Sequence, residues 1–356
     1  MRPDPTNDLT SREREILRLV VKSFIHTAGP VGSRYLSKQS SLGLSAASIR
    51  NTMSDLEEQG YLDHPYTSAG RIPTALGYRV FVDQLMESSQ LTEMEKQRLV
   101  RELERMMGDT DQLVRESSRL LGQLSSLIGV VVSPRLSEGV LERLEAVPLS
   151  SSRLMVVISV RGGLVRTLIV EVESTVRRDD LDRVLSLINE RLAGLTLEEI
   201  RRTYADRIGD LRDDETGIIR LILNEPDRLF SEHPQAKRLA LSSAQHLLEQ
   251  PEFQEPEAVR EIVQFLEDEA GVIAVLESRL DRTLIQSGEA VVSIGRERGG
   301  TVDYPADRYS IVTSEYRRGD TSGTVAVIGP MRMDYARVVA LVEGMAACLD
   351  NPSTSD

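Results

Sequence analysis

The stretch SAASIRNTMSDLEEQGYLDHPYTSAGRIPT, from Ser45 to Thr74, decides how the first part of this chain folds. Ser45 stands at an expected helix N-cap, because its hydroxyl can accept hydrogen bonds from the amides of the first helical turn. Helix-favouring residues follow from Ala46, and Gly60 is placed to end the helix at its C′ position. The turn residues that precede Arg71 then predict a short β-hairpin. The stretch therefore predicts one helix followed by a small hairpin.

The predicted helix has two chemically different faces. Ile49, Met53 and Leu56 recur at helical spacing and form the face that we expect to be buried. The first turn and the opposite face supply the candidate DNA-binding residues Ser45, Ala47, Ser48, Arg50, Asn51 and Ser54. Their small neighbours let the helix approach a major groove, where Arg suits the acceptors of guanine and Asn suits the edge of adenine. This face is therefore predicted to read bases.

The flanking elements complete a helix-turn-helix order. A capping box at Thr10 to Glu13 opens a first helix, and a second short helix is expected from about Ser33 to Gln39. The candidate wing residues are Thr67, Ser68 and Arg71, and the supporting phosphate contacts are Arg34 and Lys38. Arg71 is expected at the hairpin tip, where a guanidinium can reach a phosphate or a narrow minor groove. The alternative is a module used only for packing, with its arginines as solvated charges.

Three stretches of the chain resemble one family of regulators. The run IRNTMSDLEEQGYLDHPYTSAGRIPTALGYRVFVD, from Ile49 to Asp83, resembles the signature of the HrcA family of bacterial heat-inducible transcription repressors. VVSIGRE (Val291 to Glu297) and GPMRMDYARVVALVEGMA (Gly329 to Ala346) resemble the same family. The resemblance implies a homodimeric repressor of chaperone genes that binds an inverted-repeat operator on double-stranded DNA, with its activity supported by the GroEL chaperonin. It also implies a GAF-like domain interrupted by an inserted dimerisation domain.

Element patterns along the chain predict a multidomain α+β protein. The patterns LIGVVVS, RLMVVISV and LVRTLIVEV after residue 126 suggest one hairpin and its neighbour, and strand signals stop near Ser174 before they return at AVVSIG. The expected divisions are 1–86 for a winged-helix DNA-binding domain, 87–126 for a helical linker and the start of the body, 127–174 for the first part of the GAF-like domain, 175–250 for a mainly helical inserted dimerisation domain, 251–350 for the second part of the GAF-like domain, and 351–356 for a disordered tail.

One helix of the expected insertion supplies candidate apolar surface for the dimer. Its stripe consists of Leu181, Val184, Leu185, Ile188 and Leu192. An amphipathic stripe cannot name its partner, so packing inside the same domain is an equal alternative. A symmetric dimer is nevertheless expected, because one short helix contacts too few base pairs for high specificity and an inverted repeat matches a two-fold protein.

The net charge of −13 is distributed unevenly along the 356 residues. Residues 1–86 carry ten Lys and Arg against nine Asp and Glu, whereas the remainder carries 33 against 47. The expected DNA-binding domain, residues 1–86, is therefore nearly neutral, and the rest of the chain is acidic. This distribution predicts DNA binding by locally placed arginines rather than by a broad basic surface. The chain has neither an apolar run of membrane-spanning length nor a hydrophobic N-terminal signal region, so a cytoplasmic protein without membrane contact is expected.

No pattern in the sequence predicts catalysis, a metal or a cofactor. The four histidines stand in different elements without ligand spacing, and there is no phosphate-binding loop, nucleophile elbow or dinucleotide fingerprint. The single cysteine, Cys348, excludes an intrachain disulfide and is interpreted as a packed side chain rather than a redox sensor. Two rival functions remain at this point. One is a ligand-sensing regulator whose GAF-like domain binds a small metabolite, and the other is an enzyme with a degenerate winged helix.

Overall fold

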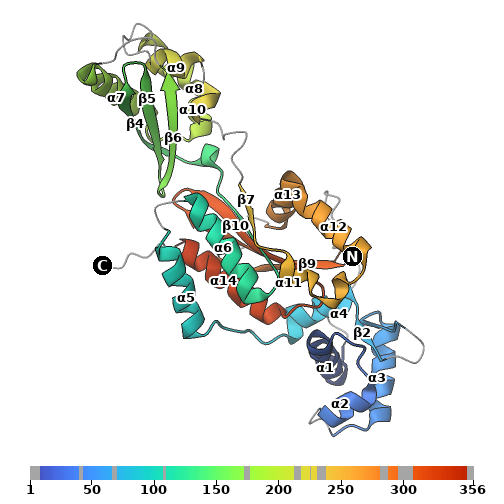
Figure 1. Cartoon of the computed structure of the whole chain (residues 1–356). Coiled ribbons are helices and arrows are strands. Elements are labelled where there is room, and N and C mark those ends of the chain that lie inside the picture. Colours follow the sequence, from blue (N-terminus) through green and yellow to red (C-terminus); the bar gives the residue numbers. More distant parts are fainter. Residues whose placement is uncertain are drawn as a thin grey trace.

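The chain is arranged in three parts, which follow one another across the molecule (Figure 1). The computed structural model describes residues 9–39, 43–65, 70–106, 110–171, 177–211, 218–224, 226–230, 238–280, 288–295 and 308–350. We call the three parts the N-terminal module (residues 9–86), the central domain, which contains a five-stranded sheet, and the distal domain, which contains a separate three-stranded sheet. The fold therefore mixes helix and sheet, as expected. Thr67, Ser68 and the expected tail at 351–356 lie outside the described residues.

The N-terminal module consists of helices followed by a two-stranded sheet. Its elements are α1 (Ser11–Thr27), α2 (Ser33–Gln39), α3 (Ala46–Glu58), β1 (Leu62–Asp63), β2 (Ile72–Pro73), α4 (Ala75–Val80) and the π-helical turn η1 (Phe81–Leu85). The predicted helix boundaries are confirmed by their caps. Thr10 and Glu13 form the capping box of α1, the Ser45 hydroxyl caps α3, and Gly60 has a φ of +82° just beyond its end.

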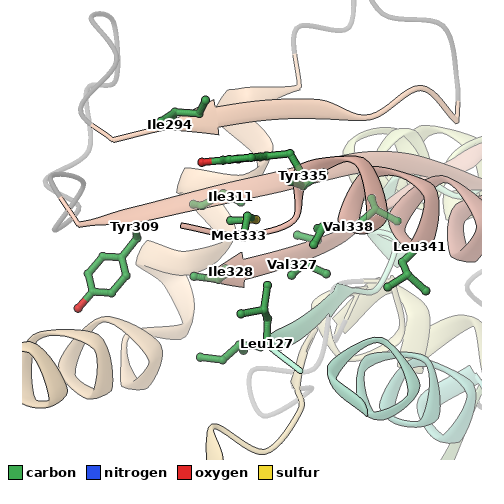
Figure 2. Packing of buried hydrophobic residues seen from close by; sticks show 14 of the residues in the cluster. Leu127, Ile294, Tyr309, Ile311, Val327, Ile328, Met333, Tyr335, Val338 and Leu341 are labelled. Carbon is green, nitrogen blue, oxygen red and sulfur yellow. The ribbon is translucent and has the colours of Figure 1, made fainter. Parts of the chain in front are cut away.

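The central domain is a sheet covered by helices that precede the distal domain in the sequence and by helices that follow it. Its elements are α5 (Glu93–Glu104), α6 (Thr110–Ser125), β3 (Ile128–Val132), β7 (Leu239–Leu241), α11 (Gln245–Leu248), η4 (Pro251–Phe253), α12 (Pro256–Glu267), α13 (Glu269–Arg279), β8 (Val291–Ile294), β9 (Tyr309–Arg318), β10 (Thr321–Pro330) and α14 (Tyr335–Asp350). The strand order is β7-β3-β10-β9-β8, with every neighbouring pair antiparallel. Figure 2 shows Met333, just before α14, and Tyr335 and Val338, at its start, packed near the apolar side chains of β9 and β10.

The distal domain has its own sheet and its own core. Its elements are η2 (Leu136–Glu138), β4 (Leu141–Ser150), β5 (Arg153–Val160), β6 (Leu164–Glu171), α7 (Arg178–Leu192), α8 (Leu197–Ile208), η3 (Gly209–Leu211), α9 (Ile218–Asn224) and α10 (Pro226–Phe230). The order β4-β5-β6 is antiparallel throughout. Its buried apolar residues form a cluster separate from the one that fills the rest of the chain. The chain therefore leaves the central sheet after β3 and returns to it at β7.

This arrangement corrects two expectations about the strands. β3 was expected to be in one sheet with the strands at RLMVVISV and LVRTLIVEV, but it pairs with β10 and β7. Those two strands, β5 and β6, pair with each other, and β5 also pairs with β4. The division at residue 174 is therefore misplaced, because strands from Leu141 onward share a core with α7 to α10. The expected insertion limits of 175–250 also wrongly include β7, which belongs to the central sheet. Strand periodicity predicts which faces are buried, but it does not identify the neighbouring strand.

The helical stripe expected to form a dimer surface is buried inside the distal domain. Leu181, Leu185, Ile188 and Leu192 are at most 7% exposed and belong to the distal core. Asn189 on the same helix holds β4, because its side-chain amide donates to the Leu144 carbonyl and its oxygen accepts from the Leu144 amide, at 2.8 and 2.7 Å. The stripe therefore packs within its own domain, which was the alternative interpretation.

An ion pair joins the first and last helices of the central domain. Glu95 belongs to the capping box that starts α5, and its carboxylate also accepts a hydrogen bond from the Arg337 guanidinium of α14. The hydrogen bond from Arg337, together with those from the backbone and hydroxyl of Thr92, lowers the pKa of Glu95 to about 2 from its ordinary value of 4.5. The ionised form of Glu95 therefore favours the folded state.

We predict that Glu95→Gln removes an acid-sensitive part of the stability. Because the folded-state pKa is depressed, this contribution is fully present above pH 4.5 and is lost as the pH falls towards 2. The difference in unfolding free energy between wild type and variant, measured by urea denaturation, should therefore be largest near neutral pH and shrink across that window. Glu93→Gln, which removes a surface pair with Lys96, should cost little at any pH. A deficit that stays constant down to pH 2 would contradict the assignment.

Candidate nucleic-acid interface

One face of α3 is uncovered at the outer end of the N-terminal module (Figure 1). Ala47, Arg50 and Asn51 are exposed, and Ser54 is half-buried on the same side. The opposite side carries Ile49, Met53, Leu56 and Thr52, all of which are buried. The helix is therefore fixed by its apolar face, while the side predicted to carry base-reading residues faces away from the core.

The serines at the start of α3 hold the helix in place. The Ser45 hydroxyl accepts a hydrogen bond from the Ser48 amide at 3.2 Å. The Arg12 guanidinium of α1 donates to the Ser48 carbonyl at 3.2 Å and also to the Ser48 hydroxyl. Ser45 and Ser48 are thus engaged in caps and interhelical bonds. Arg50 and Asn51 make no hydrogen bond or ion pair with the described residues, so their polar groups are available to an outside partner.

Arg71 does not lie at the tip of the hairpin, and that expectation is wrong. It directly precedes β2, and its backbone exchanges two hydrogen bonds with Val31, each of 2.9 Å. Its guanidinium lies 2.6 Å from the Glu57 carboxylate, and the side chain is only 22% exposed. His64, after β1, contacts the same carboxylate. Glu57 therefore ties both sides of the hairpin to α3, and Arg71 serves at the base of the hairpin.

A second exposed face lies on α2. Arg34 and Lys38, the expected phosphate contacts, are both exposed. Tyr35 stands beside them and is 42% exposed, whereas Leu36 on the other side of the helix is buried. Sequence reasoning missed Tyr35, although its place next to Arg34 on a short helix was a usable signal, because phenolic hydroxyls also donate to phosphates. The structure leaves all three side chains accessible on one element.

The charged side chains of α3 are separated along the helix, with the positive charge in its N-terminal half and the negative charges near its C-terminus. Its N-terminal half carries Arg50 without any carboxylate, whereas Asp55, Glu57 and Glu58 gather in its last turns. The amides at a helix N-terminus carry a partial positive charge, so this end favours anions and the C-terminal end disfavours them. A polyanion therefore has one favourable approach, namely to the first half of α3.

Comparisons with known proteins identify the family. A family model described as "HrcA protein C terminal domain" matches residues 111–339. The chain is 40% identical over 345 residues to the heat-inducible transcription repressor HrcA of Chlorobium phaeobacteroides (strain BS1), which covers 96% of this chain and 97% of that protein. The corresponding repressor of Chlorobaculum parvum is 44% identical over 348 residues, with 96% and 97% covered. The chain belongs to the HrcA family.

A solved structure agrees with the architecture. The crystal structure of a hypothetical protein matches 98% of this chain and 99% of its own, with a TM-score of 0.63 and 21% sequence identity, which supports the fold alone. The HrcA family consists of heat-inducible transcription repressors and not of enzymes.

Among the described residues, no helix is both long and apolar enough to cross a membrane. The part of the chain that the structure describes likewise contains no cluster of three or more His, Cys, Asp or Glu placed to hold a metal ion.

Proposed function

We propose that this HrcA protein represses transcription by binding an inverted-repeat operator as a homodimer, with the N-terminal module as a winged helix-turn-helix DNA reader. The uncovered face of α3, with Arg50 and Asn51 free of partners among the described residues, carries the proposal. Arg can form a two-pronged contact with guanine, and Asn can do so with adenine. The small side chain of Ala47 allows close approach in the first turn. The chemistry of this face therefore matches a major groove.

The charge along α3 sets the docking direction. The first half of the helix enters the groove, because the carboxylates of its last turns would repel the phosphates. Arg34, Tyr35 and Lys38 of α2 then supply phosphate contacts, which add affinity and orientation but no sequence information. Arg71 acts indirectly by holding the hairpin against Glu57. Specificity thus rests on few side chains, as expected for a near-neutral module.

We predict that Arg50→Ala and Arg71→Ala weaken operator binding in different ways. Loss of a two-pronged base contact should cost about 1–3 kcal/mol at one base pair and relax the preference there. Loss of Arg71 releases the hairpin from α3 and should weaken all sequences alike. Competition binding against operators altered one base pair at a time separates the two effects, and Arg260→Ala, on the exposed side of α12, controls for charge. Unchanged specificity in Arg50→Ala, on folded protein, would exclude α3 as the reader.

We infer that the distal domain is the inserted dimerisation domain and that its open sheet face forms the contact. Four apolar side chains are exposed there: Val147 at 46%, Leu149 at 50%, Val165 at 59% and Ile169 at 47%. The register places Met155 of β5 between Val147 of β4 and Ile169 of β6, so the apolar surface is continuous across the three strands. A patch of this kind marks a protein interface, and an inverted repeat requires a two-fold partner.

Val165→Lys should therefore dissociate the dimer without unfolding the chain. Desolvating a lysine within an apolar contact is costly, whereas in the monomer the same side chain would remain in water. Sedimentation velocity should show a monomer, and circular dichroism should be unchanged. Ser186→Lys, on the exposed side of α7, is the matched control and should remain dimeric. If Val165→Lys sediments as the wild-type dimer does, the open sheet face is not the interface.

We further propose that GroEL raises the fraction of repressor competent to bind DNA. The order of the strands along the chain supports this proposal. The central sheet combines β3, which precedes the distal domain in the sequence, with β7 to β10, which follow it. Such a chain exposes apolar surface until its distant segments meet, and chaperonins recognise that surface. Operator binding by a fixed concentration of soluble repressor should therefore increase when it is refolded with GroEL, most clearly at higher temperature. Equal active fractions with and without GroEL would contradict this role.

A further inference from the structure

The segment before α14 contains an arginine that joins two domains. Arg332 lies in the central domain and is only 12% exposed. Its Nε and Nη2 donate to the two carboxylate oxygens of Glu252 at 2.6 and 3.2 Å, and Nη2 also donates to the Gln250 side chain at 2.9 Å. Its Nη1 donates to the backbone carbonyl of Ile25, in α1, at 2.9 Å. All three guanidinium nitrogens are thus engaged, and one of them reaches the N-terminal module.

The carbonyl that Arg332 contacts needs an outside donor. Ile25 stands in the last turn of α1, where the final four carbonyls have no partner within the helix. A cation is also favoured at this end by the helix dipole. Arg332 therefore caps a helix of the N-terminal module from the central domain. The positive charge is held in place by Glu252, so that the cap has a fixed direction.

A reciprocal contact and a pair of rings complete the junction. Arg79 of α4 donates to the Val292 carbonyl of β8 at 2.6 Å, from the N-terminal module to the central domain. Between these contacts, the rings of Tyr78 and Tyr335 lie 5.9 Å apart, and both side chains are at most 1% exposed. The two domains are therefore joined by a buried ring pair and by one arginine from each side.

One side of this junction is open. A crevice of about 580 Å³ lies between the domains, lined by Lys22 and His26 of α1, by Met86 and Glu87 of the connection, and by Asp334 and Ala336. Space of this kind allows the N-terminal module to tilt about the tyrosine pair unless directional bonds prevent it. Arg332 supplies such a bond at the end of α1, which packs against α3.

We propose that Arg332 is a positioning residue that holds the N-terminal module at one angle on the central domain and thereby sets the operator half-site spacing that the dimer accepts. The proposal rests on the proposed dimeric DNA binding. When both readers are held at fixed angles, binding of the second half-site is intramolecular, and the affinity gain is lost if the geometry does not match. Each added base pair rotates one half-site by about 35°, so a rigid dimer must prefer one spacing.

The test measures affinity as a function of spacer length. Wild type, Arg332→Met and Arg332→Lys are compared on operators whose spacer is lengthened or shortened by single base pairs, and on an isolated half-site. Met keeps the apolar stem but has no donors, whereas Lys keeps the charge without the two-pronged contact to Glu252. Arg308→Met is the control, since it removes an exposed pair with Glu255 within the central domain.

We expect a sharp spacing preference for wild type and Arg308→Met. Arg332→Met should bind the preferred operator at least about tenfold more weakly, with a flattened spacing profile and unchanged half-site affinity. Arg332→Lys should fall between them. A glutamyl protease should also cut Arg332→Met faster after Glu87, in the exposed connection.

Three results would overturn the proposal. An unchanged spacing profile in Arg332→Met would show that the junction does not set the angle. An equal loss on half-site and full operator would indicate a damaged reader, and tighter binding would mean that Arg332 holds an unproductive angle. Failure of the wild type to distinguish operator from unrelated DNA would instead refute the proposed function, so the two failures are distinguishable.

Discussion

The packing of Tyr78 against Tyr335 is the contact on which the arrangement of the domains depends. It joins the apolar interior of the N-terminal module to that of the central domain, so that one continuous core runs from α1 to α14. Burial raises the pKa of the Tyr78 phenol well above its ordinary value, and its hydroxyl has no hydrogen-bond partner among the described residues. The rings therefore contribute mainly apolar area and shape. The N-terminal module consequently shares a hydrophobic core with the central domain and is not an independently folded domain on a flexible linker.

The distal domain, in contrast, does not share its hydrophobic core with the other two parts. Its core is separate, and the chain connects it to the central sheet at β3 and β7. Among its described residues, an extended apolar surface on β4 and β6 faces outward, whereas the apolar face of α7 is buried in the distal core. The central domain lies between the distal domain, which we propose for association, and the N-terminal module, which we propose for DNA reading (Figure 1). The distance between two readers would then depend on the rigidity of both connections.

Local signals in the sequence predicted local structure well. Hydroxyl caps at Thr10 and Ser45 act over three residues, so they can be predicted without knowledge of the fold. Partners distant in sequence were not predictable in this way. Arg71 was misplaced because nothing in its neighbourhood reveals the Glu57 carboxylate, and the contact of Arg332 with α1 spans 307 residues. The exposed face of α3 could be predicted from the sequence, because the apolar side chains of the helix lie on one face and leave the other face to solvent.

The shared core implies that the N-terminal module and the central domain unfold as one cooperative unit. Native-state hydrogen exchange at increasing urea tests it most directly, because it measures the opening free energy of each segment. We expect the slowest amides of α1 and α3 to exchange with those of β3 and β10 in one unfolding event, whereas β5 and β6 should open separately. If α1 and α3 open at a much lower free energy than the central sheet, the shared core does not couple the N-terminal module to the central domain.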